Sequence, residues 1–329
     1  MLIGRRGFLA GAAATMAAPA VLAQEGEMRF PHVFGETVLK EPARRVVSAG
    51  FNTQDPLLAL GVVPVGVRYW YGDYEGGIWP WARDYVGDTA PVLMQGEISV
   101  ETVAGLAPDL VVAIGSGMSR AEYDLLSQIA PVLLQEPQYS TYGTPWDVVT
   151  RTIARAVGKA DQAEAMIVDL RARFAAARAR HPDWSGRTAV AAWQDGGQTG
   201  AFLSDDVRVQ FLAELGFVPP PALASLAGTS FYTTLSPEDL SPIDADLIIW
   251  ISSYDRAADI ATLAMRQTLT AVHEGREVFG DELLAGALSF GSVLSLPWAL
   301  DRIEGDIALA MDGRPETVVP SSRKAGLVP

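Results

Sequence analysis

The stretch S-V-E-T-V-A-G-L-A-P-D-L-V-V-A-I, from Ser99 to Ile114, returns as S-P-E-D-L-S-P-I-D-A-D-L-I-I-W-I from Ser236 to Ile251. The two copies share a serine, a glutamate two residues later, and an aspartate followed by three aliphatic residues, at a constant offset of 137 residues. An offset this long indicates two related half-domains and not a short-period solenoid. In each copy the serine and early carboxylate predict the start of a helix, and the aliphatic run predicts a buried strand.

The same alternation of strands and helices runs through the rest of the chain. Short apolar runs predict strands at Arg44–Gly50, Val63–Val67 and Arg187–Trp193, and Asn52–Gly61 is predicted to be a helix. Strands that alternate with helices favour parallel sheets covered on both faces. The helical spacing of apolar residues from Gln162 to Arg180 predicts one continuous helix, about 28 Å long.

We therefore predict an α/β protein of two similar lobes, each a mainly parallel sheet flanked by helices. One long helix joins the lobes, and a ligand cleft lies between them. The predicted boundaries are residues 1–23 for a signal peptide, 24–145 for the N-terminal lobe, 146–186 for the linking helical segment and 187–329 for the C-terminal lobe.

The first residues indicate export. Arg5 and Arg6 precede an alanine-rich run with small residues at Val21 and Ala23, a pattern typical of a twin-arginine signal cleaved near Ala23. An ordinary secretory signal is the alternative. The chain contains no cysteine, so we expect no disulfide, thiol nucleophile or lipoprotein anchor. A net charge of −14 disfavours nucleic acid and anionic membrane surfaces as partners. We expect a free, monomeric periplasmic protein.

Aromatic residues gather between Tyr69 and Tyr85, a segment that holds seven of the chain's 28 aromatic residues. Glycines and a proline interrupt it, which suits a loop at the mouth of a sheet, where binding residues concentrate. Capping of the lobe by some of these rings is the alternative. Matching positions in the second lobe supply further rings and an arginine. The candidate ligand-binding residues are Arg68, Trp70, Tyr71, Trp79, Trp81, Met118, Tyr142, Trp193, Phe231, Tyr232, Tyr254, Arg256 and Trp298.

Signals for catalysis are weak. The three histidines, His32, His181 and His273, lie far apart, and the chain contains no G-x-S-x-G motif. The turn at Gly115–Arg120 lacks the third glycine of a dinucleotide loop. We therefore expect a non-enzymatic protein with no cofactor and no metal bound directly by its side chains. An exported hydrolase is the remote alternative.

These features resemble the periplasmic binding proteins that supply ABC importers with ferric siderophores, haem or cobalamin, whose lobes are joined by a single long helix. The resemblance rests on P-A-R-R-V-V-S from Pro42, L-L-A-L-G-V-V-P-V-G-V from Leu57, G-T-P-W from Gly143, and the two copies that begin at Ser99 and Ser236. The aromatic segment is most similar to the ferric-siderophore branch.

The resemblance implies that the chain captures an iron(III)-siderophore and delivers it to ABC permease subunits in the inner membrane. It also implies that Glu101 and Glu238, one on each lobe, dock into arginine pockets of the two permease subunits. Aromatic walls with few arginines favour a neutral or weakly charged chelate, with a hydroxamate preferred to a catecholate. Carriage of haem or cobalamin is the alternative, and Tyr71, Tyr74 or Tyr232 would then supply an axial ligand for haem.

Overall fold

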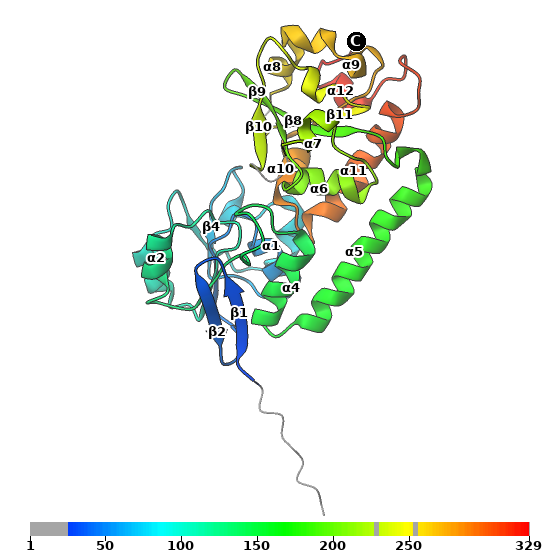
Figure 1. Ribbon diagram of the computed structural model, residues 1–329. Coiled ribbons are helices and arrows are strands. Elements are labelled where there is room, and N and C mark those ends of the chain that lie inside the picture. Colours follow the sequence, from blue (N-terminus) through cyan, green and yellow to red (C-terminus); the bar gives the residue numbers. More distant parts are fainter. Residues whose placement is uncertain (1–25, 227–229, 253–255, 329) are drawn as a thin grey trace, which may run out of the picture.

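The computed structural model describes residues 26–226, 230–252 and 256–328. The predicted signal peptide, residues 1–23, lies outside the described residues. Two α/β lobes stand one above the other in Figure 1, joined along one side by helix α5 (Ala160–Arg180). The helix predicted over residues 162–180 thus begins two residues earlier than expected. The predicted fold class, two lobes with mainly parallel sheets and one linking helix, is confirmed.

A five-stranded parallel sheet in the order β5-β4-β3-β6-β7 forms the N-terminal lobe, and the hairpin β1-β2 precedes it. Its central strands are short aliphatic runs such as Val46–Ser48, in which both valines are 0% exposed, so helices must cover both faces. The strands are β1 Met28–His32, β2 Gly35–Leu39, β3 Val46–Ser48, β4 Gly66–Arg68, β5 Val92–Met94, β6 Leu110–Val112 and β7 Val132–Leu133. The helices are α1 Gln54–Ala59, α2 Val100–Leu106, α3 Arg120–Leu126 and α4 Trp146–Ala156, with 3₁₀ helices η1 Glu75–Gly77 and η2 Pro80–Tyr85.

The C-terminal lobe contains a five-stranded sheet in the order β10-β9-β8-β11-β12. Strands β8, β11 and β12 are parallel, whereas β9 and β10 are antiparallel to their neighbours. The strands are β8 Ala189–Asp195, β9 Gln198–Phe202, β10 Tyr232–Thr234, β11 Leu247–Ile251 and β12 Glu277–Gly280. The α-helices are α6 Val207–Glu214, α7 Pro221–Ala224, α8 Ala257–Ala261, α9 Thr270–His273, α10 Glu282–Phe290, α11 Ser295–Ala310 and α12 Pro320–Lys324, with 3₁₀ helices η3 Pro182–Trp184, η4 Ser241–Ile243 and η5 Ala264–Thr268.

The aspartates of the two sequence copies have the same structural role. Asp109 accepts hydrogen bonds at 2.9 Å from the backbone N–H groups of Arg44 and Arg45, just before β3. Asp246 accepts a hydrogen bond at 2.8 Å from the backbone N–H of Thr188, just before β8. Strand β6 pairs with β3, and β11 pairs with β8. In each lobe the carboxylate therefore ties the start of one strand to the start of its neighbour.

The beginnings of the two copies differ. Ser99 caps α2 as predicted, because its hydroxyl accepts a hydrogen bond from the backbone N–H of Thr102 at 3.2 Å. The prediction of a matching α-helix at Ser236 is wrong, since this copy forms a turn followed by η4. The physical reason is Pro242, which has no N–H to donate and whose ring would clash with a carbonyl of the preceding helical turn.

The two lobes share one continuous apolar cluster at the seam between them. Trp79 and Trp81 of the N-terminal lobe stack with ring centroids 4.9 Å apart. Both rings also contact Phe290 of α10 in the C-terminal lobe, at 5.5 and 5.3 Å. Aromatic side chains bury large apolar areas, so this contact stabilises the packing of one lobe against the other.

A carboxyl group is buried in the same seam. Asp55 of α1 is 1% exposed, and its Oδ2 accepts hydrogen bonds from Trp81 Nε1 at 2.8 Å and from Ser292 Oγ at 2.5 Å. Ser292 belongs to the C-terminal lobe, so the second hydrogen bond crosses the seam. Burial raises the pKa of Asp55 to about 7, and the two hydrogen bonds oppose that rise.

Gly286 of α10 provides a test of how tightly the seam packs. An ideal Cβ atom at Gly286 would lie 2.3 Å from the ring of Trp79, whereas one at Gly305 of α11 would meet nothing within 4 Å. We expect Gly286→Ala to lower the free energy of unfolding by about 1–3 kcal/mol, because the ring cannot yield in a packed seam. The matched change Gly305→Ala should raise it by up to about 1 kcal/mol. Urea unfolding measures both, and equal effects would contradict a tight seam.

The buried carboxyl group makes stability depend on pH. The pKa of Asp55 is about 7 in the folded protein and about 3.9 in an unfolded chain, so the folded state holds the proton more tightly. This contribution to stability is complete below about pH 4 and is lost as the pH rises to about 7. Asp55→Asn should therefore reduce the loss of stability between pH 4 and 7. At pH 8 the variant should melt about 2–4 °C above the native protein.

Thermal melts between pH 4 and 8 measure this difference. Asp84→Asn is the control, because it removes the same charge from an exposed position on η2. If the melting temperatures of Asp55→Asn and the native protein change with pH in the same way, Asp55 is not the group responsible for the decline.

Candidate ligand-binding site

The carboxyl ends of the N-terminal strands form one wall of a cavity between the lobes. Phe51 and Asn52 follow β3, Trp70 follows β4, and Ile114 follows β6. Because these strands are parallel, their carboxyl ends meet at one edge of the sheet, where ligands bind in open α/β sheets. The remaining residues of this wall are Gly115, Thr141, Tyr142, Thr144 and Val149.

The C-terminal lobe supplies the opposite wall. Strands β9 and β10 pair so that Phe202 lies across from Tyr232, and both rings reach the cavity. Asp206 caps the N-terminus of α6, two residues before Arg208. The lining residues of this wall are Phe202, Asp206, Val207, Arg208, Phe231, Tyr232 and Ser289.

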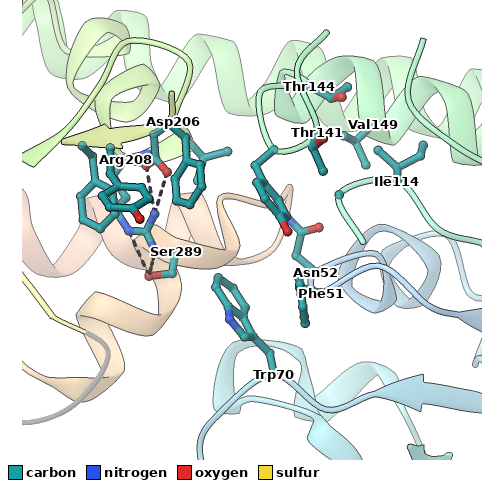
Figure 2. A pocket seen from close by; sticks show the side chains of 16 residues that line it. Phe51, Asn52, Trp70, Ile114, Thr141, Thr144, Val149, Asp206, Arg208 and Ser289 are labelled. Carbon is teal, nitrogen blue, oxygen red and sulfur yellow. Dashed lines mark hydrogen bonds and ion pairs between the residues drawn. The ribbon is translucent and has the colours of Figure 1, made fainter. Parts of the chain in front are cut away.

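The cavity has a volume of about 500 Å³, a size typical of small-molecule sites. Figure 2 shows it between Trp70, Asn52 and Thr144 on one side and Arg208 with Ser289 on the other. Contacts between the lobes border the cavity, among them a hydrogen bond and a ring pair. Asn52 donates a hydrogen bond from Nδ2 to the carbonyl of Phe290 at 2.6 Å, and the rings of Tyr142 and Phe231 meet edge to face at 5.1 Å. Six lining residues are aromatic: Phe51, Trp70, Tyr142, Phe202, Phe231 and Tyr232.

A buried ion pair lies in the C-terminal wall. Arg208 Nη1 is 2.8 Å from Asp206 Oδ2 and 3.0 Å from Oδ1, and the two residues are 6% and 3% exposed. The other edge of the guanidinium donates to Ser289 Oγ from Nη2 at 2.7 Å and from Nε at 3.2 Å. Its Cζ atom lies 3.9 Å from the centroid of the Phe202 ring. Burial raises the pKa of Asp206, and the Arg208 guanidinium opposes that rise.

One buried hydroxyl group among the described lining residues lacks an internal partner. Thr144 is 8% exposed, and its Oγ1 is buried without a hydrogen bond within the part of the chain that the structure describes. Buried polar atoms are normally hydrogen-bonded, because an unmade hydrogen bond costs the group its hydration. Thr144 therefore has an unused hydrogen bond, which reaches a bound molecule or water only if its side chain rotates toward the cavity.

Four of the predicted ligand-binding residues line the cavity: Trp70, Tyr142, Phe231 and Tyr232. They come from three segments that lie far apart in the sequence: the loop after β4, the loop before α4, and the start of β10, where Phe231 and Tyr232 are adjacent. Tyr254 lies outside the described residues.

Three predicted ligand-binding rings of the aromatic segment do not line the cavity. Tyr71, Trp79 and Trp81 are 4%, 1% and 7% exposed and belong to the apolar cluster of the seam. The segment folds into η1 and η2, and η2 contacts α1 and α11. This packing turns the indoles toward Phe290 of the other lobe, so capping of the lobe, the alternative that the sequence left open, describes these three rings.

The two predicted arginines also lie outside the lining. Arg68 stacks over the Phe51 ring, with Cζ 4.3 Å from its centroid, and donates to the Ser116 carbonyl at 2.7 Å. It therefore supports a lining ring. Arg256 forms an ion pair with Asp195, with Nη2 2.6 Å from Oδ1.

The last three predicted residues pack elsewhere. Met118 is buried in an apolar cluster of the N-terminal lobe. The Trp193 ring lies edge-on to Tyr232, with centroids 6.0 Å apart, one layer away from the cavity. Trp298 contacts Trp81 at the seam, at 5.6 Å.

Several lining residues are not among the predicted ones, notably Phe51, Asn52, Phe202, Asp206 and Arg208. Phe51 and Asn52 directly follow the glycine that ends the first predicted strand, so their place at a carboxyl end was available from the sequence. Arg208 gives no such signal, because V-R-V-Q-F is typical of an ordinary helix. Its position depends on Ser289, 81 residues away.

Over the described residues, no helix combines the length and the apolar character that a membrane crossing needs. The same residues contain no group of three or more His, Cys, Asp or Glu side chains that could hold a metal ion. The lining offers rings, hydroxyl groups, an amide and one paired guanidinium, which suit stacking and hydrogen bonding to a bound molecule.

Two α/β lobes, one linking helix and an aromatic cavity at the seam define a solute-binding protein. A family model described as periplasmic binding protein matches residues 55–282, and the chain belongs to this family. The resemblance inferred from the sequence is confirmed, and the family is one of binding proteins and not of enzymes.

Curated relatives match less than half of the chain, whereas solved structures match most of it. Over 153 residues, 44% of this chain and 49% of the relative, the sequence is 29% identical to the Fe(3+) dicitrate-binding periplasmic protein FecB of Escherichia coli (strain K12). The matches span about half the length of the curated relatives.

Among solved structures, a periplasmic solute binding protein from Mycobacterium smegmatis str. MC2 155 is 30% identical, with a TM-score of 0.77 over 87% of this chain and 99% of that one. The iron uptake protein PiaA of Streptococcus pneumoniae TIGR4, in complex with ferrichrome, is 23% identical, with a TM-score of 0.74 over 87% and 99%. This second likeness shows the fold.

Proposed function

We propose that this protein captures an iron(III)-siderophore complex in the cavity between its lobes and delivers it to an ABC transporter of the inner membrane. The proposal rests on the composition of the cavity lining. It contains six aromatic rings, and its one arginine is paired with an aspartate among the described lining residues. Flat apolar faces suit the organic shell of a metal chelate. The siderophore itself supplies the ligands that coordinate the iron, so the protein needs no metal ligand of its own.

The relatives support this class of ligand. FecB is named for Fe(3+) dicitrate, and the PiaA structure contains ferrichrome. Ferric citrate complexes are anionic, whereas ferrichrome is a neutral trihydroxamate. Within the described lining, the one cationic side chain is paired with a carboxylate, which favours a neutral or weakly charged chelate. We therefore prefer a hydroxamate to a citrate or catecholate.

The proposal includes a periplasmic location. Export by the twin-arginine route, with cleavage near Ala23, rests on residues 1–23 and on the family to which the chain belongs. Detection of the processed protein in a periplasmic fraction supports this part of the proposal independently of the ligand.

Binding of a panel of ligands tests the proposed cargo. Ferrichrome, a ferric catecholate, ferric dicitrate, haemin and cobalamin are each titrated against the intrinsic tryptophan fluorescence of the purified protein. We expect ferrichrome to bind most tightly and to quench the fluorescence, because Trp70 lines the cavity. Tightest binding of haemin or cobalamin would reassign the cargo, and binding of none of the five would overturn the proposal.

A matched pair of tyrosines shows whether the ligand occupies this cavity. Tyr142 lines it and is 38% exposed, whereas Tyr85 does not line it and is 47% exposed. We expect Tyr142→Ala to weaken binding about tenfold, the effect of one lost ring contact. Tyr85→Ala should leave the affinity unchanged.

We also propose that Glu101 and Glu238 contact the transporter. Both side chains are exposed, Glu101 in the first turn of α2 and Glu238 in the turn before η4, one on each lobe. Exposed carboxylates at the edge of an interface mainly affect which basic partner is recognised and how fast the two proteins associate. They contribute little to the stability of the lobe that carries them. The two glutamates occupy matching positions in the two sequence copies.

The double change Glu101→Ala with Glu238→Ala should leave ligand affinity intact and abolish uptake. Radioactive iron accumulation, in cells that produce the cognate transporter and lack the native binding protein, measures uptake. Glu41→Ala with Glu316→Ala is the control, because it removes the same charge from exposed positions on the same two lobes. Survival of uptake in the first variant, or equal loss in both, would contradict the proposed docking role.

A further inference from the structure

The cavity contains one positive and one negative side chain among its described lining residues, and they are paired with each other. Arg208 and Asp206 contact through Nη1 and both carboxylate oxygens, at 3.0 and 2.8 Å. Figure 2 shows the guanidinium between Asp206 and Ser289. A ligand that enters the cavity therefore meets a cation whose charge is already balanced.

Contacts on both edges and one face of the guanidinium fix the pair in place. Ser289 accepts from Nε and Nη2 of Arg208, and the Phe202 ring covers a face of the guanidinium. Asp206 also accepts a hydrogen bond from the backbone N–H of Arg208 at 2.9 Å. These contacts occupy at least three of the five N–H groups of the guanidinium. Swinging Arg208 toward a ligand would leave a buried carboxylate without its counter-charge.

The helix does not require the negative charge. Asp206 caps α6, but asparagine and serine cap helices about as well as aspartate. Buried ion pairs are also weak stabilisers compared with apolar side chains of similar size. The specific effect of a carboxylate at this position is on the charge that the cavity presents.

We propose that Asp206 determines ligand charge specificity by cancelling the charge of Arg208, so that the cavity selects ferric chelates without net negative charge. This inference rests on the proposed function and deepens it. An anionic chelate loses its hydration on entry and gains no net attraction, because the carboxylate lies beside the guanidinium. A neutral chelate loses less hydration and keeps the aromatic contacts.

A four-protein series separates charge from shape. Asp206→Asn gives the cavity a net positive charge, Arg208→Gln gives it a net negative charge, and the double variant restores neutrality. Each purified protein is titrated with ferrichrome, which is neutral, and with ferric dicitrate, which is anionic. The quantity compared is the ratio of the dicitrate to the ferrichrome dissociation constant, because partial unfolding of a variant cancels in this ratio.

We expect this ratio to fall about tenfold or more in Asp206→Asn and to rise in Arg208→Gln, as one unit charge at short range requires. In the double variant it should return to within about threefold of the native value. Asp206→Ser, which also keeps a capping oxygen, replaces Asp206→Asn if thermal melting shows the latter to be unfolded. If the ratio does not change in a folded Asp206 variant, the proposed role of Asp206 is wrong, whereas the proposed function still stands. Failure of the native protein to bind either chelate overturns this inference, and the five-ligand titration then decides whether the proposed function fails as well.

Discussion

The aromatic seam between the lobes is the contact on which the rest of the structure depends. Trp79 and Trp81 from one lobe and Phe290 from the other belong to a single apolar cluster, and full burial of a large ring contributes about 1.5–3 kcal/mol relative to exposure. Wide separation of the lobes would expose these faces to water. Because α5 also joins the lobes along one side, the two walls of the cavity are held close together. A preformed site loses less conformational entropy when a ligand binds.

The electrostatics of the cavity differ from those of the whole chain. The protein carries a net charge of −14, yet the lining contains a neutral pair, Asp206 with Arg208, among rings and hydroxyl groups. The surface charge disfavours anionic partners at long range, and the paired guanidinium gives an anionic ligand no net attraction at short range. Both effects act in the same direction. Thr144, with its unpartnered hydroxyl, adds a hydrogen-bonding group without adding charge.

Much of the architecture is accessible from sequence because it depends on local pattern. Aliphatic runs identify β3, β6 and β11, and helical spacing identifies α5 to within two residues. The shared aspartates of the two copies have equivalent roles, since Asp109 and Asp246 each tie neighbouring strands together. Where the pattern fails, a local cause is visible. Pro242 prevents the second copy from forming the α-helix that Ser236 suggests.

The sequence by itself determined the class of fold, the duplicated half-domains, the linking helix and the concentration of aromatic rings in one segment. Only the tertiary structure decided which of these rings reach the cavity: Trp70 lines it, whereas Trp79 and Trp81, on the same segment, close the seam. It also decided that Arg208, with no distinctive sequence context, lines the cavity. The physical reason is that secondary structure follows from the spacing of residues near in sequence. The direction of a side chain depends on partners such as Phe290 and Ser289, which the chain brings close only when it folds.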